Sequence, residues 1–114
     1  MSTLGLLEKA LNIRAFYQKV LASNIANVET PGYSEKKIDF QAELDRSGNG
    51  DASSVRVTEN DPPDGAGSLD GNTVNVEDQV VKMTENSLMY NALVQLISKK
   101  FSMMKYVISG GGQS

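Results

Sequence analysis

The strongest constraint on the fold is an apolar repeat that runs almost to the C-terminus. Its positions alternate at spacings of three and four residues: Val80, Met83, Ser87, Tyr90, Val94, Ile97, Phe101, Met104 and Ile108. Four heptads of this kind predict one long helix with a seam in which only Ser87 is polar. Of residues 80–108, 17 of 29 are apolar or aromatic, so more than one face of this helix needs a partner.

The residues around this repeat predict where the helix begins and ends. Asn75 is a suitable N-cap, and acidic residues in the first turn oppose the positive end of the helix dipole. Asp78 is placed to pair with Lys82 four residues later. A glycine run from Gly110 ends the helix. We therefore expect a helix from about Glu77 to Ile108.

A second long helix is expected near the N-terminus, from about Thr3 to Asn27. One stripe at helical spacing contains Leu4, Leu7, Leu11, Leu21, Ile25 and Val28, and it is interrupted by Arg14 and Gln18. An adjacent stripe contains Leu6, Ala10, Ile13, Tyr17 and Val20. Two stripes make a broad apolar face, which favours packing against more than one element.

The end of this helix is marked by Thr30-Pro-Gly-Tyr33. Proline disfavours the helical conformation at Thr30, and Pro31-Gly32 suits the central positions of a type II turn. The short amides of Asn24 and Asn27 are suited to bonding locally with freed backbone groups at the helix end. The sequence predicts a helix that stops abruptly and continues as extended chain.

The middle of the chain has a different composition. Residues 41–72 are rich in Gly, Asp, Asn and Ser and contain few large apolar residues. We expect a mostly irregular acidic loop, in which Val55–Val57 and Thr73–Val76 are candidates for two short paired strands. The fold class is therefore mainly α: a coiled-coil-like hairpin of the two long helices around a short irregular or β segment. Its three segments are residues 1–34, 35–76 and 77–114.

Composition excludes several functions. The chain has 114 residues, a net charge of −3, and no His or Cys, so His- and Cys-based catalysis, His or thiolate metal sites and disulfides are excluded. We expect no enzyme, cofactor or metal site. The acidic balance argues against nucleic-acid binding. Neither a transmembrane run nor a cleavable signal peptide is visible in the sequence.

Several blocks at both ends of the chain resemble a known family. Asn24-Ile-Ala-Asn27 followed by Thr30-Pro-Gly-Tyr33 resembles the N-terminal signature of bacterial flagellar axial proteins, which include rod, hook and hook-associated subunits. Ile38-Asp39-Phe40, Ser68–Glu77 and Asn86–Tyr90 are similar to the proximal-rod members of that family. The resemblance covers roughly residues 7–40 and 68–108.

The resemblance implies a structural subunit of the flagellar proximal rod, exported without a cleavable signal peptide by the flagellar type III apparatus. Its implied partners are other rod subunits, the adaptor that joins the rod to the membrane ring, and the export apparatus, and self-association is expected. The implied assembly motif consists of Asn24, Asn27, Thr30, Pro31, Gly32 and Tyr33. The expected helix packing and polymerisation residues are Leu7, Leu11, Leu21, Ile25, Val80, Met83, Tyr90, Val94, Ile97, Phe101, Met104 and Ile108.

Two alternatives stay open at this point. One is another type of rod subunit, because rod and hook proteins share the N-terminal motif. The other belongs to a different class: a coiled-coil adaptor or regulatory binding protein, since heptads alone would suit it. Independently of the family, uncovered apolar faces on a short chain predict an assembly protein.

Overall fold

A computed structural model describes residues 2–46, 48–50, 54–59 and 74–110. The chain is mainly α-helical and elongated, with extents of 70 × 27 × 17 Å. Its elements are α1 (Thr3–Ala26), β1 (Lys36–Lys37), α2 (Phe40–Asp45), β2 (Thr58–Glu59) and α3 (Val76–Ile108). Two long terminal helices and a short central unit are present, as the sequence predicted.

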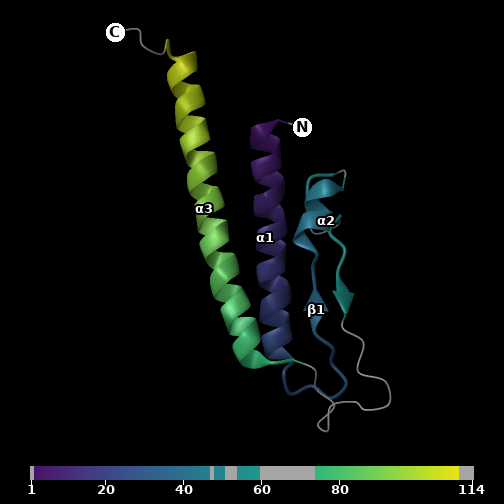
Figure 1. The fold of residues 1–114 in the computed structure, drawn as a ribbon. Coiled ribbons are helices and arrows are strands. Elements are labelled where there is room, and N and C mark those ends of the chain that lie inside the picture. Colours follow the sequence, from purple (N-terminus) through teal and green to yellow (C-terminus); the bar gives the residue numbers. More distant parts are fainter. Residues whose placement is uncertain (1, 47, 51–53, 60–73, 111–114) are drawn as a thin grey trace.

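The two long helices lie side by side and run in opposite directions (Figure 1). The 24 residues of α1 correspond to about 36 Å, and the 33 residues of α3 to about 50 Å. The end of α1 and the start of α3 lie at the same end of the molecule, so α3 extends past the start of α1 at the other end. The predicted helical hairpin is confirmed, with one arm longer than the other.

Both helices are capped at their ends, and the caps at Asn27 and Asn75 are those that the sequence predicted. The Ser2 side chain accepts a hydrogen bond from the Gly5 amide at the start of α1, and Asn75 does the same for the Asp78 amide at the start of α3. Asn27 caps the C-terminus of α1. Ser109 ends α3, and Gly110 follows with φ +107°, a conformation that favours glycine.

Helix α1 is the middle layer of the molecule. Figure 1 shows α3 on one side of it and the unit of β1 and α2 on the other. The tightest apolar core belongs to α1, where Ile13 and Leu21 are 0% and 1% exposed. Two neighbours explain why the sequence of α1 carries two apolar stripes rather than one.

The central segment differs from the predicted loop in two ways. A short helix, α2, begins after Asp39, whose side chain accepts a hydrogen bond from the Ala42 amide. In the described part of the chain, β1 and β2 pair antiparallel, with Lys36 opposite Glu59 and Lys37 opposite Thr58. Residues 55–57, where a strand was expected, are therefore not in a strand and lie just before β2, whose partner is 36–37 instead of 73–76.

The predicted strand at 73–76 is wrong where it can be examined. Val76 opens α3, Val74 is not in a strand, and Thr73 lies outside the described residues. Helix capping by Asn75 explains the result, because the N-cap fixes the chain for a helix immediately after it.

Within the described ranges, no helix combines the length and hydrophobicity needed to span a membrane.

Candidate assembly site

The predicted turn at the end of α1 has the expected geometry. The Tyr33 amide donates a hydrogen bond to the Thr30 carbonyl over 3.2 Å, and Gly32 has φ +78°. These are the features of a type II turn with Pro31 and Gly32 at its centre. The turn reverses the chain, which brings residues 33–36 back alongside the last turns of α1.

Asn27 and Thr30 stabilise the approach to this turn. The Asn27 amide group donates to the Ser23 carbonyl at 2.9 Å, which satisfies a freed acceptor at the helix end. The Thr30 hydroxyl donates to Asn27 Oδ1 at 3.1 Å, and the Thr30 amide to the Asn27 carbonyl at 2.9 Å. The local role predicted for Asn27 is confirmed.

Asn24 has a long-range role instead of the local one that the sequence suggested. Its Nδ2 donates to the Lys36 carbonyl at 3.0 Å and to Oε1 of Gln79 at 2.9 Å. Its Oδ1 accepts from the Lys36 amide at 3.0 Å and from the Tyr33 hydroxyl at 2.9 Å. The side chain is 0% exposed. Asn24 thus joins α1, the chain after the turn, and the first turn of α3.

Glu35 extends this contact to the next turn of α3. Its Oε2 accepts from Nε2 of Gln79 at 2.9 Å and from Nζ of Lys82 at 2.9 Å. Lys82 also pairs with Asp78 at 3.0 Å, as the sequence predicted. We call Asn24, Tyr33, Glu35, Gln79 and Lys82 the Asn24 network.

The charges in this network stabilise each other. Burial of the Glu35 carboxylate raises its pKa, but hydrogen bonds from Lys82 and Gln79 outweigh burial and leave the pKa below its usual value. Burial lowers the pKa of Lys82, and hydrogen bonds to Glu35 and Asp78 outweigh it in turn, so this pKa is raised. Both groups are therefore charged at neutral pH.

A second polar contact joins the helices two turns further along. Asn86 Nδ2 donates to the Arg14 carbonyl at 2.9 Å and to Oε1 of Gln18 at 2.8 Å. Gln18 Nε2 donates to the Ser87 hydroxyl at 3.1 Å, and Arg14 Nη1 to Oδ1 of Asn86 at 3.3 Å. The guanidinium of Arg14 also lies 3.8 Å from the ring centre of Phe40, a cation–π contact that ties α2 to α1.

These contacts make the helix interface largely polar. The buried residues of α3 are Gln79, Asn86 and Ile97. Gln79 and Asn86 occupy positions one residue before Val80 and Ser87 of the predicted seam, so the face in contact with α1 is rotated relative to it along the first half of α3. The apolar residues of α3 are correspondingly displaced toward the outside.

The predicted packing residues fall into three groups in the single chain. Leu21 and Ile97 are buried. Five are partly buried: Leu7, Leu11, Ile25, Met83 and Tyr90. Five are exposed: Val80, Val94, Phe101, Met104 and Ile108. The structure thus buries or partly buries about half of the predicted set and leaves the rest on the surface.

Sequence reasoning missed the polar interior, although the sequence held a signal for it. Arg14 and Gln18 interrupt the apolar stripe of α1, and Ser87 interrupts the seam of α3. Gln79 and Asn86 are seven residues apart, which is one heptad. Polar residues at matching positions of two facing helices predict paired hydrogen bonds across the interface.

Chemistry beyond binding has no visible basis in this site. The described residues contain no cluster of three or more acidic side chains suited to a metal ion. The one buried carboxylate of the Asn24 network is already held by Lys82 and Gln79. The arrangement fixes the geometry of a helix pair, which is a structural function.

Comparison with known proteins identifies the family. The family model described as "Flagella basal body rod protein" matches residues 1–33, which are α1 and the turn. The flagellar basal body rod protein FlgB of Bacillus subtilis is 33% identical over 122 residues, covering 96% of this chain and 95% of that protein.

Two further relatives with the same name agree. FlgB of Escherichia coli is 36% identical, with 91% of each chain covered, and FlgB of Cereibacter sphaeroides is 37% identical, with 94% of each covered. These matches extend well beyond the N-terminal motif into α3. The chain belongs to the FlgB family of flagellar basal body rod proteins, which are structural components of the flagellum rather than enzymes.

Proposed function

We propose that this chain is a structural subunit of the proximal part of the flagellar rod, polymerised through its terminal helices. The observation that carries the proposal is the uncovered apolar surface of α3. Val81, Leu88 and Leu96 are 54%, 65% and 52% exposed, on a helix that contacts α1 alone among the described elements. An apolar face this long is covered in a stable assembly.

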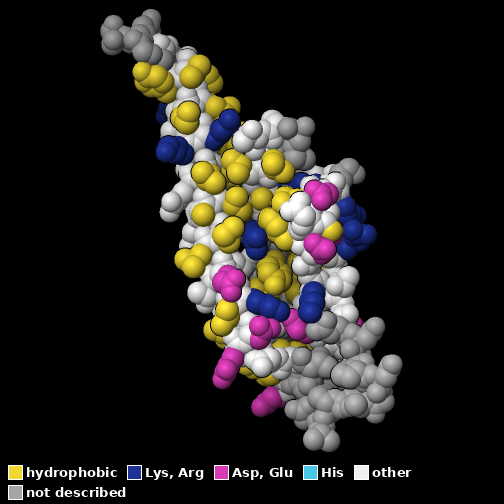
Figure 2. Space-filling view, viewed as in Figure 1, with side chains coloured by type: hydrophobic (Ala, Val, Ile, Leu, Met, Phe, Trp, Pro, Cys, Tyr) yellow, Lys and Arg dark blue, Asp and Glu magenta, His cyan; other side chains and the backbone are white. Residues whose placement is uncertain are grey.

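Figure 2 supports this assignment of surfaces. Hydrophobic side chains lie along much of the length of α3 on the face shown, while acidic side chains gather toward the opposite end of the molecule from the C-terminus. Polar contacts lie inside the helix pair, and many of the apolar residues of α3 are left outside it. In the proposed rod, α1 and α3 form the wall and the segment around α2 faces outward.

The proposed partners follow from this placement. Neighbouring rod subunits cover the apolar face of α3. The adaptor between rod and membrane ring contacts the end of the rod that is nearest the ring. The flagellar export apparatus delivers the chain to the rod. Head-to-tail contacts that do not close would produce a tube rather than a discrete dimer.

The experiment that tests the proposal is a clean in-frame deletion in the source bacterium. We expect ring structures without rod or hook by electron microscopy, and no swimming. Complementation with the full-length chain should restore both. Complete flagella and normal swimming in the deletion strain would overturn the proposal. They would favour the coiled-coil adaptor that the heptads alone allow.

A further inference from the structure

The last three turns of α3 form a surface that no other described element covers. Residues 101–110 are all exposed, because α3 continues past the start of α1 (Figure 1). We call residues 99–108 the overhang. Phe101, Met104 and Ile108 follow Ile97 at spacings of four, three and four, so they continue the side of α3 that is buried against α1 at Ile97.

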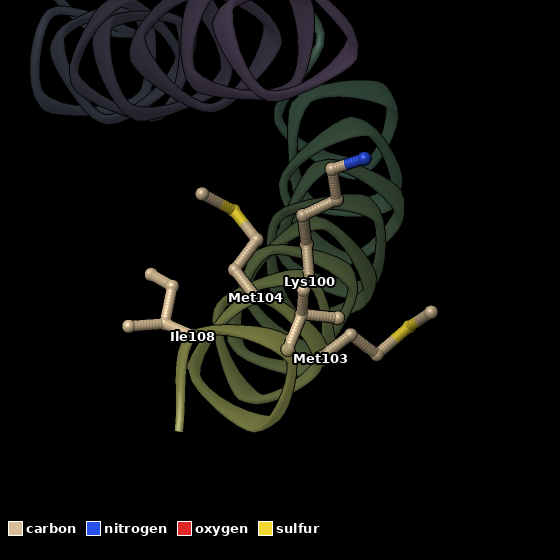
Figure 3. A pocket seen from close by; sticks show the side chains of 5 residues that line it. Lys100, Met103, Met104 and Ile108 are labelled. Carbon is tan, nitrogen blue, oxygen red and sulfur yellow. The ribbon is translucent and has the colours of Figure 1, made fainter. Parts of the chain in front are cut away.

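This surface has the form of a helix-binding site. Lys100, Met103, Met104 and Val107 line a hollow together with Ile108. The first four are spaced i, i+3, i+4 and i+7, which is the set that forms a hole for one side chain of a facing helix. Figure 3 shows Met104 and Ile108 projecting to one side of α3 and Met103 to the other.

The charge of the overhang restricts what can bind there. It contains Lys99, Lys100 and Lys105, and no acidic residue occurs anywhere in residues 86–114. Two overhangs paired symmetrically would bring positive charge to positive charge with no carboxylate between them, which is unfavourable. A helix with carboxylates beside its apolar stripe would instead form an ion pair with Lys100, which lines the hollow.

We propose that the overhang is the docking site for an acidic amphipathic helix of a neighbouring subunit of a different protein. The helix binds beside the side of α3 that α1 covers at Ile97, places an apolar side chain between Lys100, Met103, Met104 and Val107, and sets a carboxylate against Lys100. That this helix comes from the rod rests on the proposed function. The nearest rival occupant is the start of α3 in a second copy, although Asp78 there is already paired with Lys82.

The binding chemistry can be tested on the purified full-length protein. The probe is a synthetic 21-residue helical peptide with Leu at positions a and d and Glu at e and g, and its control carries Lys at e and g. We expect the Glu peptide to bind about tenfold more tightly or better at low salt. Equal binding of both peptides would overturn the proposal.

Two variants locate the contact. Met104→Glu adds a carboxylate inside the hollow and should weaken binding of the Glu peptide about tenfold. Ser102→Glu adds the same charge to the outward side of the overhang and should change it less than about twofold. Both residues are exposed in the single chain, so circular dichroism melts should stay at the wild-type temperature. Equal weakening by the two variants would contradict the assigned face.

The occupant itself is identified in cells. A photo-crosslinking residue at position 104, in a complemented deletion strain, should join the chain to an acidic helical segment of another protein in isolated basal bodies. Crosslinks to a second copy, to another part of the same chain, or to a segment without acidic residues would overturn the inference. If that strain swims without any crosslink at 104, and Met104→Glu also swims normally, the docking site is wrong while the rod function stands.

Discussion

Asn24 and Gln79 lie 55 positions apart in the sequence and share a hydrogen bond of 2.9 Å across the helix pair, with both side chains 0% exposed. The bond joins the signature stretch at the end of α1 to the first turn of α3. Because Asn24 also holds the chain after the turn, one amide group fixes three segments. The position of α3 relative to the turn therefore depends on a polar contact.

Replacing Asn24 is expected to loosen all three segments. Asn24→Ala would leave Gln79 and the Lys36 backbone groups buried without their partner, and we expect a loss of about 2–4 kcal/mol in the free energy of unfolding. Urea denaturation measures the change. Asn27→Ala is the matched control, since it removes a local cap and should cost only about 0.5–1.5 kcal/mol. Equal losses in the two variants would contradict the proposed role of Asn24.

The ion pair of Glu35 and Lys82 should make stability fall in acid. The pKa of Glu35 lies below its ordinary value of 4.5 in the fold. Its contribution is therefore complete above about pH 4.5 and is lost as the pH falls through the folded pKa. The raised pKa of Lys82 acts oppositely, with a contribution that is lost only as the pH rises through that folded pKa.

Urea midpoints at pH 7 and pH 3 measure this effect. Glu35→Gln should lower the midpoint at pH 7 and flatten its dependence on pH, because Gln79 and Lys82 lose the carboxylate that they hold. Glu85→Gln, at an exposed position of α3, serves as the control and should keep the wild-type slope. A wild-type slope in Glu35→Gln would show that other groups govern the acid response.

The turn at Pro31 and Gly32 gives a prediction about backbone alone. Gly32 has φ +78°, and a Cβ built there meets no atom within 4 Å. Gly32→Ala should therefore cost about 1–2 kcal/mol from backbone strain, and Gly32→Val more, since the branched side chain tolerates this region poorly. We expect Gly32→Val to block rod assembly, and swimming assays measure this.

Two other substitutions check that reasoning. Gly32→Asn should recover much of the loss, because Asn accepts positive φ more readily than other residues. Gly50→Ala should be worse than Gly32→Ala, since its Cβ would lie 2.8 Å from the Lys9 carbonyl oxygen as well as having φ +76°. Normal swimming of Gly32→Val would show that rod assembly does not depend on the geometry of this turn.

The elements that the sequence predicted well are those with local causes. The Thr30–Tyr33 turn, the Asn75 cap and the Asp78–Lys82 pair depend on neighbours within four residues, and the structure contains all three. Apolar periodicity likewise located both long helices to within about a turn. The short helix α2 was missed because six residues carry little periodicity, although Asp39 was a suitable N-cap for it.

The contacts of the site were harder to predict because they join distant residues. Asn24 was expected to bond locally, whereas the turn places it beside Lys36 and Gln79, and no spacing along the chain shows that. The apolar repeat of α3 likewise did not show which of its sides contacts α1, where Gln79 rather than Val80 is buried. A seam read from hydrophobicity cannot distinguish residues that pack within the chain from those kept for another subunit, since both are apolar.

Residues that pack within the chain can be distinguished from those that contact another subunit by variants that change only folding or only assembly. Leu88 is 65% exposed on α3, so Leu88→Ser should change the free energy of unfolding by less than about 0.5 kcal/mol. It should nevertheless abolish swimming, because the same side chain is buried between subunits in the proposed rod.

Leu21→Ala, at a position 1% exposed, should instead cost about 2–5 kcal/mol in the free energy of unfolding of the isolated protein. Asn91→Ser, another exposed position of α3, controls for substitution itself and should preserve both stability and swimming. Normal swimming of Leu88→Ser at wild-type protein levels would mean that this face of α3 is not an interface in the rod. The apolar surface of the helix would then need another explanation.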